Sequence, residues 1–559
     1  MQTIGDILEV LSRGSDAYRL DRFHSLADWW AAFAAWPPNV FALTSILLGQ
    51  SGAYRLVVSP PPLSNWRPCA DRPGWLAEVQ KLANDWSARL ENSSRGNAAP
   101  PPEAVLVLGY ELTQAAPRLV RELHRCQDSA SASLCQLLLL LHAAADNACA
   151  GFGLTEQPIT PLRMQANELL MDTGSLALLS GSIVRVLPKF RTPQVGITLR
   201  ALSHYLTVDH SEVDVRFLAN AELCADRARG LNLLIVPWPF EIKKDDFYEV
   251  TPRWDQLNHP FSGFDFAPQG LPSVADTVRA ALAEVDSRGS PVDGVVLPEA
   301  AVTFDEMKDI QEVLAERSSP PFLLTGLRGP YLNEAVLAIY RREARRWLVY
   351  RQSKHHRWCI DRFQIEQYGL GLPRDDRRYW EHIDVPPRQM HFTVGARGVT
   401  LCHLVCEDLA RVDPVAELIR AVGPTLVIAL LLDGPQLQHR WPARYSSVLA
   451  DDPGSSVLSV TCLGMAHRYQ TPGRPPSRVI GLWKDVRMGF RELELGDHAQ
   501  GILLKLRAET REEFTADGRS DGAAAAVLIY DGHEDVRTGS CSFCGRGSGR
   551  CPQCGRAGA

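Results

Sequence analysis

The middle of the chain alternates short apolar runs with amphipathic stretches. LNLLIVPWPF at 231–240 has the length of a buried strand, and VADTVRAALAEVDSRG at 274–289 spaces its apolar residues for one helix face. VDGVVLPE then returns as a strand, and PVAELIRAVG followed by TLVIALLLDG repeats the helix-then-strand unit. Such alternation predicts an α/β fold in which helices cover the sheets.

The first 227 residues show a different pattern. Residues 1–150 are predicted to form a mainly helical domain of unknown role, interrupted by the proline clusters at 59–68 and 97–103. The longest apolar run, at 133–145, is too short for a membrane span and predicts a buried helix. Residues 151–227 are predicted to be a connector. Its basic stretch favours a solvated segment over a phosphate site, and it contains Lys189, Arg191 and Arg200.

Length, charge and cysteine content narrow the class of protein. A chain of 559 residues is too long for one core, so two or three domains are expected. Its net charge of -6 gives no general attraction to nucleic acid. The first residues do not resemble an export signal. The chain has thirteen cysteines, and the candidate chemistry described below needs one of them as a thiolate, so a reducing compartment is favoured. We therefore expect a cytoplasmic protein.

A carboxylic acid, an amine and a thiol each follow an apolar run, about 50 residues apart along the chain. In order they are Glu299, Lys354 and Cys406. A thiol that attacks a carbon bonded to nitrogen needs a base for its proton and a cation for the developing charge. Glu299 is the candidate base, and Lys354 is the candidate cation that also favours the thiolate. Each residue alone is more commonly a buried cysteine or a solvated charge. The ordered set instead predicts one site that forms a thioester or thioimidate on Cys406.

The flanks of these residues, VVLPEA, RQSKHHRW and LVCEDLAR, resemble the motifs of the carbon–nitrogen hydrolase (nitrilase) superfamily. The Cys-Glu-Asp sequence is most similar to the glutaminase branch fused to NAD synthetases. The resemblance covers roughly residues 228–510. It implies a four-layer α-β-β-α sandwich, a homo-oligomer and hydrolysis of an amide or nitrile without a catalytic cofactor.

The resemblance also implies two further site residues. FQIEQYGLG is similar to the family's second-Glu segment and gives the supporting role to Glu366, with Asp361 as the nearer alternative. The backbone amide of Glu407, directly after the nucleophile, would donate to the oxyanion.

The C-terminal residues contain a metal-binding pattern. Cys541, Cys544, Cys551 and Cys554 form two CxxC pairs six residues apart, a spacing typical of one tetrahedral Zn²⁺. A redox pair or disulfides are the alternatives. Four thiolates leave no open position, so residues 541–559 are predicted to be a structural zinc-binding tail. The acidic, glycine-containing residues 511–540 are predicted to link it to the enzyme body.

Two functions follow from these features. The first is a cytoplasmic amidohydrolase acting on a small-molecule amide or nitrile. The second is a sensing or assembly module of a bacterial antiviral system, because nitrilase-like domains resembling this one accompany antiviral reverse transcriptases. The helical front and the zinc tail are candidate contacts for a protein partner. Nucleic acid is not expected as a direct substrate, and no membrane association is expected.

Overall fold

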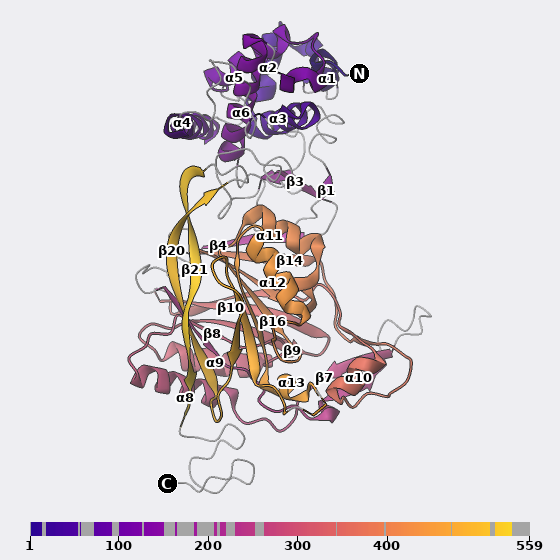
Figure 1. Cartoon of the computed structure of the whole chain (residues 1–559), viewed down its shortest axis with the longest axis vertical. Helices are drawn as coiled ribbons and strands as arrows, with labels where there is room; N and C mark the ends of the chain where they lie inside the picture. The colour runs from indigo at the N-terminus through magenta and orange to yellow at the C-terminus, as the bar shows by residue number, and fades with distance from the viewer. Residues whose placement is uncertain are drawn as a thin grey trace. The chain divides into compact units, whose positions relative to one another are not determined.

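The computed structural model shows two compact units (Figure 1). It describes residues 2–13, 18–53, 56, 72–91, 100–125, 128–149, 163–164, 184–186, 206–209, 213–219, 230–251, 262–514 apart from 343, 396–398, 471 and 474, and 520–538. The first unit comprises residues 1–216 with 420–423 and 511–525, and the second comprises 217–419, 424–510 and 526–559. The basic residues Lys189, Arg191 and Arg200 lie outside the described residues.

The first unit is built mainly from helices in its described part. They are α1 (Ile4–Arg13), η2 (Leu20–Arg22), α2 (Leu26–Ala34), α3 (Pro37–Ser51), α4 (Arg72–Glu91), α5 (Glu103–Gln114), η4 (Val120–Arg125) and α6 (Ser129–Cys149). A small sheet follows in the order β1 (Arg163–Met164), β3 (Leu206–Asp209), β2 (Val184–Val186).

The helices share one apolar core. The indole N–H of Trp30 on α2 donates to the carbonyl of Val105 on α5 at 2.6 Å. Helix α6 has the length and hydropathy of a membrane span over Ser129–Ala148, yet 72% of that window is buried in the protein. The apolar run at 133–145 therefore forms a buried helix, as the sequence predicts.

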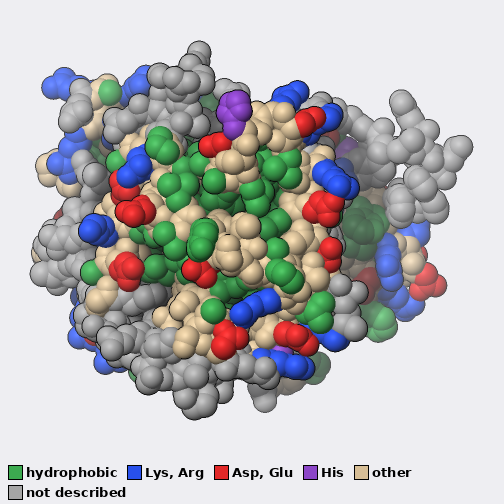
Figure 2. Space-filling view, turned by 90° about the horizontal axis from the view of Figure 1, so that it is seen from above, with side chains coloured by type: hydrophobic (Ala, Val, Ile, Leu, Met, Phe, Trp, Pro, Cys, Tyr) green, Lys and Arg blue, Asp and Glu red, His purple; other side chains and the backbone are tan. Residues whose placement is uncertain are grey.

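Several large apolar side chains of this unit remain exposed. They are Val10 on α1, Leu20 in η2, and Leu106, Val107 and Tyr110 on α5. Figure 2 shows apolar side chains gathered in the middle of one face. That the N-terminal region binds a protein partner stays a prediction.

The second unit contains two large sheets. The first has the order β11 (Arg346–Ser353), β10 (Leu332–Arg341), β9 (Phe322–Gly329), β8 (Gly294–Val296), β5 (Leu231–Ile235), β20 (Gly501–Phe514), β21 (Ser520–Val536). The second has the order β19 (Arg491–Glu494), β18 (Val479–Lys484), β17 (Ser456–Thr461), β16 (Leu426–Leu431), β15 (Thr400–Val405), β14 (Arg388–Val394), β4 (Val213–Ala219).

The two sheets face each other through buried side chains. Gln352 on β11 donates through Nε2 to the carbonyl of His403 on β15 at 2.9 Å, and its Oε1 accepts from the N–H of His391 on β14 at 2.9 Å. Helix α9 (Phe304–Ala315) packs on β9 and on α8 (Val274–Ser287), while α12 (Trp441–Asp451) packs on β17 and β18. The predicted α/β fold is confirmed, with helices outside the paired sheets (Figure 1).

A smaller sheet and several short helices complete this unit. The sheet has the order β12 (Cys359–Ile360), β13 (Tyr379–Glu381), β7 (Ser262–Phe266), β6 (Phe247–Val250). The helices are η6 (Lys244–Asp246), α10 (Arg362–Tyr368), η9 (Cys406–Ala410), η10 (Val412–Ala416), α11 (Glu417–Val422) and α13 (Leu463–Arg468).

The predicted linker at 511–540 is corrected. Residues up to Phe514 continue β20, and Ser520–Val536 form β21 at the edge of the first sheet. The apolar run at 526–529 is buried, which the acidic composition of the preceding residues concealed. Burial of this run explains why the segment forms a strand.

Candidate active site

Strand ends bring the three predicted residues to one edge. In the first sheet β8 is parallel to β9, and β9, β10 and β11 are successively antiparallel, so β8 and β11 end at the same edge. Glu299 lies three residues beyond β8, and Lys354 follows β11 directly. In the second sheet Cys406 follows β15, which is parallel to β16. Packing the sheets face to face therefore assembles the site from both.

An acid, an amine and a second acid form a buried ion-pair cluster. The ammonium of Lys354 donates to Oε1 of Glu299 at 2.8 Å and to Oε2 of Glu381 at 2.7 Å. Lys354 and Glu299 are each 1% exposed, and the Glu381 side chain is 13% exposed. Because charges this buried are costly unless paired, the three groups stabilise one another.

Asn333 connects the same two carboxylates. Its Nδ2 donates to Oε1 of Glu299 at 2.8 Å and to Oε1 of Glu381 at 2.6 Å. Asn333 lies at the start of β10, which runs antiparallel to β11, so it reaches the edge where Lys354 lies. Its carbonyl also accepts the backbone N–H of Lys354 at 2.9 Å.

The second oxygen of Glu299 faces the other sheet. Oε2 accepts the backbone N–H of Leu432, directly after β16, at 2.6 Å. The Glu299 carboxylate lies close enough to the thiol of Cys406 for its charge to raise the pKa of that thiol. Glu299 is therefore placed to take the thiol proton.

The electrostatics of the cluster favour a neutral thiol at rest. Burial raises the pKa of Cys406 well above its ordinary value, and the nearby charge of Glu299 adds to this, while Lys354 only partly opposes it. Lys354 favours the thiolate as expected, but burial and the charge of Glu299 outweigh this one ammonium, which is already shared by two carboxylates. Nucleophilic attack then requires a base.

Burial acts in opposite directions on the pKa values of Glu299 and Lys354. Burial raises the pKa of Glu299, although Lys354 opposes the shift, so its carboxylate binds a proton more readily than an exposed one. Burial alone would lower the pKa of Lys354, but Glu299 and Glu381 outweigh it and raise that pKa well above its ordinary value. Lys354 therefore keeps its proton, and so its positive charge, in the folded protein.

The backbone is strained at Cys406 and directly after Glu299. Cys406 has φ of 43°, and Ala300, directly after Glu299, has φ of 49°. Residues other than glycine rarely adopt this left-handed region, and such strain is concentrated at functional sites. A Cβ on Gly326 would lie 2.4 Å from Cα of Glu299, so β9 approaches the Glu299 loop as closely as only glycine allows.

The structure brings Glu381, and not the predicted Glu366, into contact with Lys354. Glu366 lies on α10, where its side chain is 44% exposed and pairs with Arg362 at 3.2 Å. Asp361 caps the N-terminus of that helix by accepting the N–H of Gln364. Between Lys354 and Glu381 the chain forms α10 and then β13. Glu381 is therefore far from Lys354 in sequence, and the sequence spacing did not identify it. One sequence feature pointed to Glu381: it is the acid at the end of YWE, just as Glu299 is the acid at the end of VVLPE.

Asp408, two residues after Cys406, contacts the residues that follow Lys354. Both carboxylate oxygens of Asp408 accept the backbone N–H of His355 at 3.1 Å, and Oδ1 lies 3.1 Å from Nδ1 of His356. Glu407 follows Cys406 in the first turn of η9, and its side chain pairs with Arg411 at 2.8 Å. The backbone amide of Glu407 as oxyanion donor remains a proposal.

The predicted metal site falls beyond the described residues. Cys541, Cys544, Cys551 and Cys554 all lie there, so zinc binding stays a prediction. Within the described ranges, no group of three or more His, Cys, Asp or Glu side chains is arranged to hold a metal ion.

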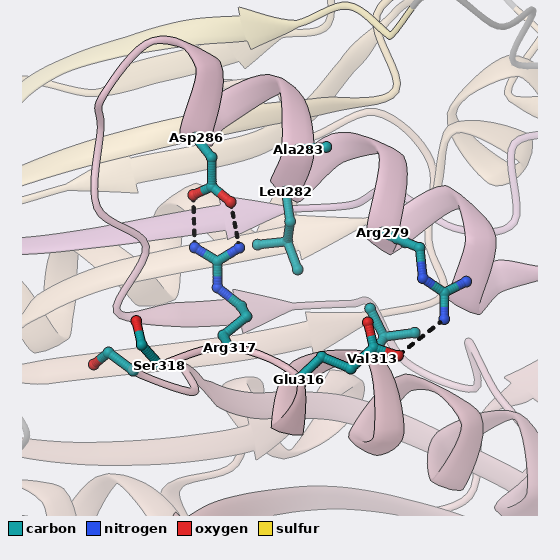
Figure 3. A pocket seen from close by; sticks show the side chains of 9 residues that line it. Arg279, Leu282, Ala283, Asp286, Val313, Glu316, Arg317 and Ser318 are labelled. Atoms are coloured by element: carbon teal, nitrogen blue, oxygen red, sulfur yellow. Dashed lines mark hydrogen bonds and ion pairs between the residues drawn. The ribbon is translucent and has the colours of Figure 1, made fainter.

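A concavity apart from this cluster lies between α8 and α9 (Figure 3). Its cavity volume is about 510 Å³. Arg317 pairs with both oxygens of Asp286 at 2.6 Å, and Arg279 lies 3.6 Å from Glu316. Its arginines thus already pair with carboxylates, which makes it a poor candidate for binding an anion.

Comparisons with known proteins give distant structural matches. No protein-family model matches the sequence, and no curated protein was found as a relative. An amidase from Nesterenkonia sp. is 14% identical, with a TM-score of 0.29 over 55% of this chain and 92% of that one. A CN-hydrolase superfamily protein from Xanthomonas campestris, with an arsenic adduct in its active site, is 14% identical, with a TM-score of 0.25 over 42% and 76%. Nit3 of Saccharomyces cerevisiae, a member of branch 10 of the nitrilase superfamily, is 11% identical, with a TM-score of 0.27 over 57% and 93%.

Proposed function

We propose that the protein hydrolyses a non-peptide carbon–nitrogen bond, an amide or a nitrile, through a covalent intermediate on Cys406. The observation that supports this most is the buried cluster in which Lys354 bridges Glu299 and Glu381, with Glu299 near enough to Cys406 to raise the pKa of its thiol. Two carboxylates and an amine would be an expensive way to stabilise a fold, since such charges can often be replaced by apolar side chains without loss.

With an amide substrate, the sulfur of Cys406 attacks the carbonyl carbon as the thiol proton passes to Glu299. Lys354 has three N–H donors, and two are used by Glu299 and Glu381. We assign the third to the carbonyl oxygen as it becomes negative, together with the backbone amide of Glu407.

Glu299 then protonates the departing nitrogen as the carbon–nitrogen bond breaks, which leaves a thioester on Cys406. A water molecule attacks this thioester after giving its proton to Glu299, and the acid is released with the thiol restored. Glu381 accepts from Lys354 throughout and so holds the ammonium in place. The raised proton affinity of Glu299 suits a group that must both accept and donate a proton.

Acylation by p-nitrophenyl acetate tests this proposal without knowledge of the natural substrate. We expect a burst of p-nitrophenolate, about one per chain, and an acetyl group on the peptide containing Cys406. Cys406→Ala should abolish the burst. Cys402→Ala is the matched control, because Cys402 is a buried cysteine on β15, the strand that leads to Cys406, and its loss should leave the burst intact.

The amide and nitrile specificity is then sought with a panel of small primary amides and nitriles, using release of ammonia as the readout. A folded wild-type protein that neither acylates at Cys406 nor releases ammonia would contradict the hydrolase and favour the sensing or assembly role.

A further inference from the structure

Asn333 occupies an unusual place in the cluster. One amide nitrogen donates to both carboxylates, and Lys354 donates to the same pair. The four groups thus form a closed ring in which the two acids alternate with the two donors. Oδ1 of Asn333 has no hydrogen-bond partner, although the residue is buried.

The charges explain this orientation of the amide. If the amide were turned over, Oδ1 would face two carboxylate oxygens at hydrogen-bonding distance, and the repulsion would exceed the cost of one unpaired carbonyl. The two acids therefore fix the amide, and the amide in turn fixes the acids.

A neutral donor differs here from either alternative. A second cation would neutralise both acids and weaken Glu299 as a base, while an apolar side chain would leave the like charges of Glu299 and Glu381 opposed. An amide relieves that repulsion without adding a charge. The titratable groups that act on Glu299 are Lys354 after β11, Glu381 on β13, Cys406 in η9 and Cys462 beside α13.

We propose that Asn333 is a positioning residue that keeps both carboxylates turned toward Lys354 and keeps Glu299 ionised, ready to take the proton of Cys406. This inference rests on the proposed function, since it assigns Asn333 to the base of that reaction. Asn333 does not contact the substrate in this account. It acts on the reaction through Glu299.

The test is the pH dependence of acylation by p-nitrophenyl acetate at low concentration, where the acid limb reports the ionisation of Glu299 in the free protein. Asn333→Asp has nearly the same shape but places a third carboxylate in the ring, and the acid limb should move upward by roughly one to two pH units. Asn333→Ala removes the shared donor and should move the acid limb upward by roughly one unit.

Asn232→Ala is the matched control. Asn232 is a buried asparagine at the far end of β5, where its Nδ2 donates to the carbonyl of Pro291 at 3.0 Å. Its loss should lower stability and leave the acid limb at the wild-type pH. A structural role for Asn333 would likewise lower the acylated fraction without moving the limb, and that result would overturn the inference.

A second readout separates this inference from the proposed function. The infrared band of a protonated carboxyl, assigned by its absence in Glu299→Gln, reports the protonation of Glu299 whether or not Cys406 reacts. A shift of that titration in both Asn333 variants supports the role of Asn333 even if the wild type shows no burst. Unshifted titration alongside a normal wild-type burst would refute Asn333 alone.

Discussion

Replacing Lys354 by Met should lower the stability of the folded protein and make that stability depend strongly on pH. Met fills a similar space, so the main change is the loss of the cation between Glu299 and Glu381. Breaking a buried ion pair from one side typically costs about 3–5 kcal/mol. We expect a loss of that size at pH 8, where both carboxylates would be ionised in the unfolded chain.

The sign of the pH dependence follows from the unpaired acids. Without Lys354, which opposes the rise, the pKa of Glu299 in the folded variant should lie further above the unfolded value, so the folded state binds the extra proton. Stability is then greatest near the unfolded pKa of about 4.3 and is lost as pH rises through the folded pKa. One proton held across two pH units corresponds to about 2.7 kcal/mol, so the variant should regain that much between pH 7 and pH 5.

Urea unfolding followed by tryptophan fluorescence at pH 5, 6, 7 and 8 measures this. Lys308→Met is the control, because Lys308 is exposed on α9 and lies over the ring of Phe304. It should change stability by no more than about 0.5 kcal/mol at every pH. A Lys354→Met variant that is equally destabilised at pH 5 and pH 8, or not destabilised at all, would refute the electrostatic reasoning.

Other variants test the remaining assignments. Glu381→Gln should slow acylation of Cys406 by about 100-fold, whereas Glu366→Gln should leave it unchanged, and the reverse ranking would restore the choice made from spacing. Glu299→Gln should slow acylation by roughly 10²–10⁴-fold, as measured by p-nitrophenolate release, and near-normal rates would exclude it as the base. Burial lowers the pKa of His403 to about 4, so wild-type stability should fall by about 3 kcal/mol as pH drops from 6.5 to 4, and His403→Leu should lose this dependence in urea titrations. Removing residues after 535 should release about one zinc per chain, measured by elemental analysis, without loss of Cys406 acylation, and loss of both together would show that the tail completes the site.

The sequence predicts the site best where function and strand periodicity coincide. Glu299, Lys354 and Cys406 each follow an apolar run, so recognising the runs as strands was enough to place all three at strand ends. Glu381 was not predicted because its position depends on the pairing of β13 with β7, which lies more than 100 residues away in the chain. No local sequence pattern encodes that contact. The raised pKa of Cys406 could not be predicted from the sequence either, because the burial that raises it exists only once the two sheets have assembled.

The same distinction explains the error at residues 511–540. The charges and glycines at 511–522 resemble a linker by composition, and the apolar run after them is short. Only the presence of β20 as a neighbour turns that run into an edge strand. Composition describes what a segment prefers alone, whereas a strand is stabilised by the partner against which it packs.

The hydrogen bond from Leu432 to Glu299 joins groups 133 residues apart and links the two sheets. Closing so long a loop costs entropy before any contact compensates for it, so we expect this bond to form late in folding. A nascent chain that ends before β16 already contains Glu299, Lys354 and Cys406 but lacks the last donor to the base. During synthesis the nucleophile would therefore be an ordinary cysteine, and the chain would acquire its chemistry only when the second sheet closes over the first.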